Sequence, residues 1–114
     1  MPDPPERRFL IDLRDQIGSE ELQRLVPIFE ADITDTIAGL EASIDRSDFV
    51  SARRVAHKAA GTLAQYGFRD LSHTALAIEA MPDVLLPDAG RALVVSFRGA
   101  IVSFRELIAS IARS

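Results

Sequence analysis

The stretch of sequence that decides the fold carries a histidine inside a strongly patterned helix. It reads Phe49-Val50-Ser51-Ala52-Arg53-Arg54-Val55-Ala56-His57-Lys58-Ala59-Ala60-Gly61-Thr62-Leu63-Ala64-Gln65-Tyr66-Gly67. Its apolar residues recur at three- and four-residue steps and so share one helix face, comprising Phe49, Ala52, Val55, Ala56, Ala59, Leu63 and Tyr66. With an advance of about 100° per residue, His57 falls about 140° from the centre of that face. We therefore expect its side chain to point toward solvent.

Gly61, one turn after His57, is an unusual residue for the interior of a helix. Glycine in such a position is less favourable than alanine by about 1 kcal/mol. The other residues one turn away are Arg53, Arg54 and Ala60, since three- and four-residue separations are adjacent on a helix surface. We infer that something other than helix stability requires the absence of a side chain beside the imidazole.

The rest of the chain is a series of amphipathic helices separated by short breaks. The proline-rich residues 1–5 predict a flexible or extended lead-in, and residues 6–114 are expected to form a single domain. The periodicity predicts helices over about residues 6–17, 20–45, 49–66, 70–81 and 89–112. Because helices joined by short loops pack as antiparallel neighbours, we expect an all-α fold, an antiparallel four-helix bundle with a short additional N-terminal helix.

Individual residues predict where these helices end. Gly18 and Gly67 are expected to stop the helices that precede them. The expected N-caps are Ser19, Ser47 or Asp48, and Asp70.

Two prolines mark further irregularities. Pro27 is expected either to kink the second helix or to mark a short turn that leads into it. The segment 82–88, which begins at Pro82, is expected to be a loop whose apolar centre folds over one end of the bundle.

The composition excludes several classes of function. The 114-residue chain has no cysteine, which excludes disulfides, zinc–thiolate sites and iron–sulfur clusters. Its formal charge is −4 and its basic residues are spread along the chain, without the clustered footprint of a nucleic-acid-binding protein. It has neither a signal peptide nor an apolar run long enough to cross a membrane, so we expect a cytoplasmic location. A start at Met1 and an end just after the last helix favour a free-standing protein.

Spacing alone leaves two interpretations of His57 open. It is either a solvated surface histidine or an exposed nucleophile toward a group that a partner supplies. No Asp, Glu or His lies three or four residues away to complete a metal site, and His73 belongs to the next helix. A nucleophilic triad is unsupported too, because the chain has no Ser or Cys in a strained turn and no glycine-rich oxyanion loop.

The segment resembles the phosphoacceptor motif of histidine-containing phosphotransfer (HPt) domains. That motif has a histidine, a glycine four residues later, a small or hydroxyl residue, an amide, a glycine ten residues after the histidine, a leucine, and a later Leu-Glu pair. The matching positions are His57, Gly61, Thr62, Gln65, Gly67, Leu71 and Glu79, with Ile78 in place of the second leucine. The similarity covers about residues 19–111, and the four-helix bundle of the family agrees with the periodicity.

The resemblance implies a role in multistep His–Asp phosphorelay signalling. His57 would accept a phosphoryl group from the aspartyl phosphate of a receiver domain and pass it to another receiver, without catalytic turnover of its own. The implied partners are response-regulator receiver domains, a hybrid histidine kinase, or both, and such domains are often monomers. The family needs no cofactor or metal of its own, since the receiver brings the Mg²⁺.

The resemblance also assigns expected roles to the neighbours of His57. Ala60, Gly61 and Ala64 would leave a shallow surface, poor in side chains, that a partner can approach closely. Gln65 would orient the imidazole or contact the partner, with a solvated glutamine as the alternative.

One position departs from the family pattern. A lysine usually follows the histidine by three residues, where it can neutralise phosphoryl oxygens, but this chain has Ala60 there. Lys58 lies about 100° around the helix and is a poor geometric substitute. Arg53 and Arg54 are candidates to supply the charge, since arginine suits phosphate, or they form a solvated basic face.

Two other functions are alternatives for this chain. One is an interaction-only bundle that binds a signalling partner without phosphotransfer, for which Ala60 leaves room. The other is the dimerisation and phosphoacceptor part of a histidine kinase, which typically has an acid just after the histidine and a proline five residues after it. Lys58 and Thr62 occupy those positions here. His73 is expected to be a surface or packing residue.

Overall fold

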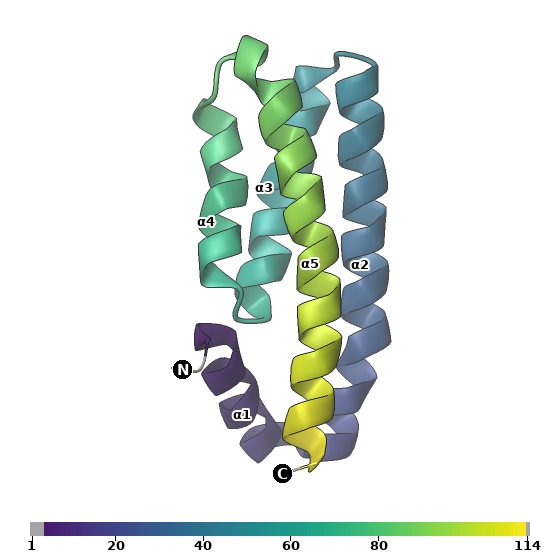
Figure 1. The fold of residues 1–114 in the computed structure, drawn as a ribbon, viewed down its shortest axis with the longest axis vertical. Helices are drawn as coiled ribbons and strands as arrows, with labels where there is room; N and C mark the ends of the chain where they lie inside the picture. Colours follow the sequence, from purple (N-terminus) through teal and green to yellow (C-terminus); the bar gives the residue numbers. More distant parts are fainter. Residues whose placement is uncertain (1–3, 114) are drawn as a thin grey trace.

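The computed structural model describes residues 4–113 and is helical throughout, with no strand in that range. The elements are α1 (Pro5–Ile17), α2 (Ser19–Asp45), α3 (Phe49–Gln65), α4 (Arg69–Ala77), the 3-10 helices η1 (Ile78–Ala80) and η2 (Asp83–Leu85), and α5 (Leu86–Arg113). Helices α2 to α5 alternate in direction and form a four-helix bundle, while α1 packs beside its lower end (Figure 1). The expected all-α bundle with an additional N-terminal helix is confirmed.

The helices differ in length, and this difference shapes the molecule. Helices α2 and α5 contain 27 and 28 residues and run along its long dimension of 46 Å. The shorter α3 and α4 occupy the upper part, and α1 lies below the turn that joins them (Figure 1). The α3–α4 pair therefore forms one side of the bundle and the α2–α5 pair the other.

An aromatic cluster joins the α3–α4 turn to the two long helices. Phe29 of α2 lies at its centre, with ring centroids 4.4 Å from Phe104 of α5 and 4.9 Å from Tyr66. Phe68 stacks on Phe29 from the other end of the turn at 5.5 Å. Such aromatic pairs add about 0.5–1.5 kcal/mol each beyond the area that they bury.

The buried face of α3 consists almost entirely of small residues. Its members, each 2% exposed or less, are Ala52, Ala56, Ala59, Ala60 and Leu63. Because the distance between packed helices depends on the side chains at the contact, this alanine face lets neighbouring helices approach α3 closely.

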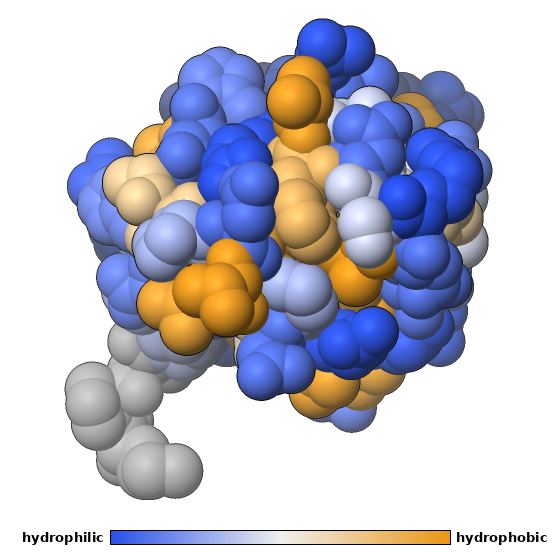
Figure 2. All heavy atoms as spheres, turned by 90° about the horizontal axis from the view of Figure 1, so that it is seen from above, coloured by the Kyte–Doolittle hydropathy of each residue, from blue (hydrophilic) through white to orange (hydrophobic). Residues whose placement is uncertain are grey.

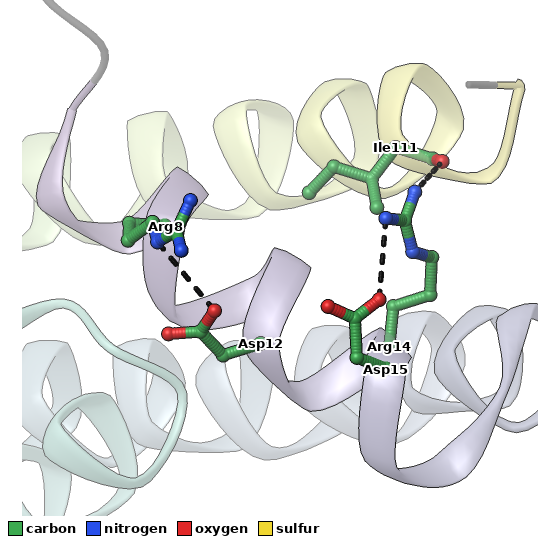
Figure 3. Close-up of polar contacts among 5 residues, drawn as sticks. All are labelled: Arg8, Asp12, Arg14, Asp15 and Ile111. Atoms are coloured by element: carbon green, nitrogen blue, oxygen red, sulfur yellow. Dashed lines mark hydrogen bonds and ion pairs between the residues drawn. The ribbon is translucent and has the colours of Figure 1, made fainter.

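Helix α1 is held by one buried side chain and several polar contacts. Leu10 is fully buried, whereas Phe9 and Ile17 remain more than a third exposed. The Arg14 guanidinium donates a 3.1 Å hydrogen bond to the Ile111 carbonyl near the end of α5 (Figure 3). These contacts attach α1 to the end of the bundle far from the connection between α4 and α5, residues 78–85.

The N-cap of α3 is Asp48, one of the two residues expected there. Its carboxylate accepts hydrogen bonds from the Ser51 hydroxyl at 2.7 Å and from the Ser51 backbone N–H at 3.1 Å. These two bonds, the hydroxyl first, lower the pKa of Asp48 below its ordinary value. The cap fixes the start of the helix that carries His57.

The N-caps expected at Ser19 and Asp70 are wrong. Ser19 is the first residue of α2 and Gly18 is its N-cap, because the positive φ of Gly18 (+88°) turns the chain within one residue. Likewise Gly67 (φ +89°) turns the chain so tightly that Phe68 caps α4. Asp70 lies in the first turn instead, where its charge favours the helix N-terminus.

The region around Pro82 also differs from expectation. Helix α4 ends at Ala77 and tightens into η1, rather than continuing to Met81. Helix α5 begins at Leu86, three residues before the expected Ala89, because Pro87 is tolerated in a first helical turn.

The apolar centre of this segment does not cover the bundle end as a unit. Leu86 is buried, but Val84 is 83% exposed and Leu85 is also exposed. Figure 2, which looks onto this end, shows apolar side chains scattered among hydrophilic ones.

The expectations for Pro27 and for the proline-rich lead-in are partly wrong. Helix α2 continues through Pro27, so no turn separates two helices there. Helix α1 begins at Pro5, within the expected lead-in, because proline suits the first helical position. Residues 1–3 of that lead-in lie outside the described residues.

The two glycines with positive φ allow a direct test of the α1 contact. A Cβ at Gly67 would lie 2.8 Å from Cγ of Phe9, whereas a Cβ at Gly18 would meet nothing within 4 Å. We expect Gly18→Ala to lower the free energy of unfolding by about 1–3 kcal/mol from backbone strain alone, because its φ of 88° and ψ of 160° suit only glycine. Gly67→Ala should carry a cost from displacing Phe9 in addition to its backbone strain. Urea denaturation would measure both, and a cost of Gly67→Ala that is unchanged in a Phe9→Ala background would contradict a tight contact between Phe9 and the turn.

Candidate functional site

His57 lies in the middle of α3, on the side away from the buried alanine face. Its side chain is 68% exposed, which confirms the expectation from its position in the helix. A neutral imidazole at such a position is accessible to a partner as a nucleophile. Its chemistry then depends on which ring nitrogen carries the proton.

Glu79 of η1 determines that choice. Its Oε1 forms a hydrogen bond with Nδ1 of His57. An ionised carboxylate only accepts hydrogen bonds, so Nδ1–H is the donor and the lone pair of the neutral ring resides on Nε2. The site therefore presents Nε2 as its nucleophilic atom.

The antiparallel course of α3 and α4 brings Glu79 to His57. The chain reverses at Gly67, so residues about ten positions before and after that turn lie opposite one another. The neighbouring Ile78 is 1% exposed and anchors η1 in the core. Glu79, the next residue, remains half-exposed at the edge of α3.

The sequence interpretation did not give Glu79 this role. It matched Glu79 to the family pattern, but considered partners only within one helical turn of His57. The two residues are 22 positions apart, and only the reversal at Gly67 brings them together. That glycine was the available signal, because a tight turn between two antiparallel helices pairs the residues on either side of it.

A shallow depression of about 280 Å³ lies beside the imidazole. Its lining residues are His57, Ala60, Gly61, Ala64, Ser72 and Leu76. The structure thus places three of the expected docking residues next to His57, together with two residues of α4. A Cβ added at Gly61 would meet nothing within 4 Å, so the protein itself leaves this space open.

Ala60, the position where the family usually has lysine, is only 2% exposed. Its carbonyl accepts a 2.8 Å hydrogen bond from the hydroxyl of Ser72, so α4 packs directly over this part of α3. A long side chain at position 60 would have to emerge past Ser72 and Leu76, which line the same depression. Position 60 therefore brings no cationic group to the depression.

The remaining predicted site residues do not line the depression. The Arg53 guanidinium donates hydrogen bonds to the Met81 carbonyl at 2.7 Å and to Asp83 at 2.6 Å. Arg54 is exposed on α3, and Gln65 is its exposed last residue.

Lys58 lies on a different side of α3. It lines a groove between α2 and α3 together with Asp32 and Asp35. This position, outside the depression beside His57, supports the expectation from helix geometry that Lys58 is a poor substitute for the missing lysine.

Within residues 4–113, no group of three or more His, Cys, Asp or Glu side chains could hold a metal ion. His73 is exposed on α4. Across the same part of the chain, no helix is both long and apolar enough to cross a membrane.

A scan against models of protein families matches the Hpt domain over residues 24–112. The chain belongs to the Hpt domain family. Hpt domains are phosphotransfer carriers of His–Asp phosphorelays rather than catalysts, and they interact with receiver domains and histidine kinases. Searches of curated proteins and of solved structures gave no match. The matched segment of this Hpt domain excludes α1 and the first residues of α2.

The contact between Glu79 and His57 makes a prediction about the isolated protein. Replacing the charged acceptor, as in Glu79→Gln, should shift the neutral imidazole from the Nδ1–H tautomer toward the Nε2–H tautomer, because hydrogen bonds to an ionised group are roughly twice as strong as neutral ones. The ¹⁵N chemical shifts of the His57 ring report this ratio. Glu106→Gln, an exposed change on α5, serves as the control. Unchanged shifts in Glu79→Gln would contradict the assignment of Nε2 as the nucleophile.

Proposed function

We propose that this Hpt domain is a phosphocarrier in a multistep His–Asp phosphorelay. In this proposal His57 accepts a phosphoryl group from the aspartyl phosphate of one receiver domain and passes it to another. The observation that carries the proposal is an exposed imidazole whose Nδ1 is hydrogen-bonded to Glu79, so that Nε2 is available for attack. The partners are response-regulator receiver domains or a hybrid histidine kinase.

The chemistry follows from this hydrogen bond. The lone pair of Nε2 attacks the phosphorus of the aspartyl phosphate, an N–P bond forms, and the P–O bond to the aspartyl carboxylate breaks. The carboxylate leaves with the bonding electron pair. The ring becomes a phosphoimidazolium that keeps its proton on Nδ1, and the carboxylate of Glu79 stabilises the positive charge that develops there. Transfer to the second receiver is the same step in reverse, so no proton has to leave the site.

The depression beside His57 provides room for the partner. Reacting atoms must come within about 3–3.5 Å, so the receiver has to bring its aspartyl phosphate close to α3. The open space at Gly61 and the small side chain of Ala64 permit this approach. In our proposal Gln65, which is exposed two turns after His57, contacts the docked receiver.

The transferred phosphoryl group also needs nearby positive charge. Ala60 cannot supply it, and Arg53 is hydrogen-bonded to Asp83 and Met81. Arg54 lies one turn before His57 and is the exposed arginine closest to it along α3. In our proposal the Mg²⁺ of the receiver is the principal cation, and Arg54 assists at the edge of the interface.

The absence of a lysine at position 60 favours one alternative function. An Hpt-like bundle that binds a signalling partner without transferring phosphate would need the docking surface but no phosphate-stabilising cation. The hydrogen bond between Glu79 and His57 argues for transfer, since binding alone would not require a defined imidazole tautomer.

Incubation with phosphorylated receiver domains tests the proposal directly. Wild-type protein should acquire an acid-labile, base-stable phosphoryl label, and His57→Gln should acquire none. His73→Gln is the matched control, because it removes the second histidine and should retain full labelling. If wild-type protein binds receivers of its own organism yet none of them labels it, the interaction-only function is favoured.

Substitutions at Gly61 should affect docking of the receiver and stability of the fold differently. A Cβ added at Gly61 or at Gly99 would meet nothing within 4 Å. Because alanine favours the helix over glycine, Gly61→Ala and Gly99→Ala should each raise the free energy of unfolding by about 0.5–1 kcal/mol. Gly61→Ala should nevertheless slow transfer from the receiver, and Gly61→Leu should slow it further, whereas Gly99→Ala on α5 should not. Denaturation and single-turnover labelling give the two quantities. Full transfer activity in Gly61→Leu would contradict close docking at this position.

A further inference from the structure

Arg53 has a contact pattern that the proposed function does not explain. It is an arginine on the helix of the phosphoacceptor, yet its side chain is only 26% exposed. One guanidinium nitrogen donates both to the backbone carbonyl of Met81 and to the carboxylate of Asp83. Arg53 therefore joins α3 to the α4–α5 connection, which we define as residues 78–85.

His57 makes a parallel contact one helical turn later. Residues 53 and 57 are four apart, so their side chains are neighbours on the surface of α3. Both reach the same connection, His57 through Glu79 and Arg53 through Met81 and Asp83. The Met81 carbonyl is only two residues from Glu79, so the Arg53 contact restrains the backbone that carries the Glu79 side chain.

The α4–α5 connection has few restraints of its own. It consists of two three-residue 3-10 helices, η1 and η2, separated by extended backbone at Met81 and Pro82. Hydrogen-bond geometry in 3-10 helices is poorer than in α-helices. Ile78 is buried before Glu79, but the residues that follow, Val84 and Leu85, are exposed. After Glu79, Met81 packs partly buried against the core. The Arg53 hydrogen bonds add a polar restraint at the Met81 carbonyl and at the exposed Asp83, where the chain leaves the core.

We propose that Arg53 is a positioning residue for phosphotransfer, which holds the α4–α5 connection so that Glu79 stays hydrogen-bonded to Nδ1 of His57. The effect on phosphotransfer rests on the proposed function, whereas the effect on the imidazole does not. This role differs from the phosphate-binding role considered from the sequence, because the guanidinium is already bound to Asp83 and Met81.

The tautomer of His57 in the isolated protein is the decisive measurement. Arg53→Ala should move the ¹⁵N shifts of the ring in the same direction as Glu79→Gln. In the double variant, Arg53→Ala should add no further shift, because an effect that acts through Glu79 disappears once that carboxylate is gone. Arg53→Lys, which keeps a charged donor, should restore much of the wild-type ratio. Arg54→Ala removes the same charge one residue away and should leave the tautomer ratio unchanged.

The transfer rate gives a second readout. Arg53→Ala should slow labelling by a phosphorylated receiver by about tenfold, the lower end of the loss known for partners of metal-bound histidines, because Arg53 acts only through Glu79. Arg98→Ala, which removes another ion pair between helices on the far side of the bundle, should leave the rate unchanged.

Three results would overturn the positioning role. They are an unchanged tautomer in Arg53→Ala, an equal shift in Arg54→Ala, and additive shifts in the double variant. If Arg53→Ala does not fold, Asp83→Ala removes one anchor at an exposed side chain and should shift the tautomer in the same direction. A tautomer shift combined with no labelling of wild-type protein would support the positioning contact and refute the proposed phosphotransfer, so the two failures are distinguishable.

Discussion

The close packing of α3 against its neighbours, which its alanine face permits, is the constraint on which the rest of the structure depends. Its buried residues at positions 52, 56, 59 and 60 are all alanine, and the Ser72 hydroxyl of α4 lies close enough to hydrogen-bond to the Ala60 carbonyl. The same proximity brings η1 alongside α3 and places Glu79 within reach of His57. The aromatic cluster around Phe29 fixes the turn from which α4 starts. This turn sets the register between α3 and α4, and the contact between His57 and Glu79 depends on that register.

Helix α1 lies outside the segment that matches the family and takes no part in the site. The family match begins within α2, and α1 packs against the α3–α4 turn and the end of α5, at the opposite end of the molecule from the α4–α5 connection. Phe9 covers Gly67, whose positive φ makes the turn possible. Helix α1 therefore supports the turn from outside, without approaching the depression beside His57.

Much of the fold and part of the site could be predicted from the sequence. The helices and the exposure of His57 follow from periodicity, which depends only on neighbours within a few turns. The caps at Ser19 and Asp70 were wrong because glycine conformations at Gly18 and Gly67, not side-chain oxygens, determine where those helices begin. The contacts of Glu79 and Arg53 join residues 22 to 30 positions apart, and they depend on how closely two helices pack. Periodicity does not give the distance between two helices. The phosphate-binding role expected for Arg53 therefore did not take its contacts with Met81 and Asp83 into account.

The burial of Ala60 also bears on the timing of the proposed relay. A phosphoryl group on Nε2 would have no lysine from this position beside it, because residue 60 is a buried alanine. The magnesium ion of a bound receiver would then be the strongest cation near the phosphohistidine, and the charged intermediate would be most stable while the partner remains in place. Such a carrier is suited to handing phosphate on within a short-lived complex. It is poorly suited to storing the signal as a long-lived, freely diffusing phosphoprotein.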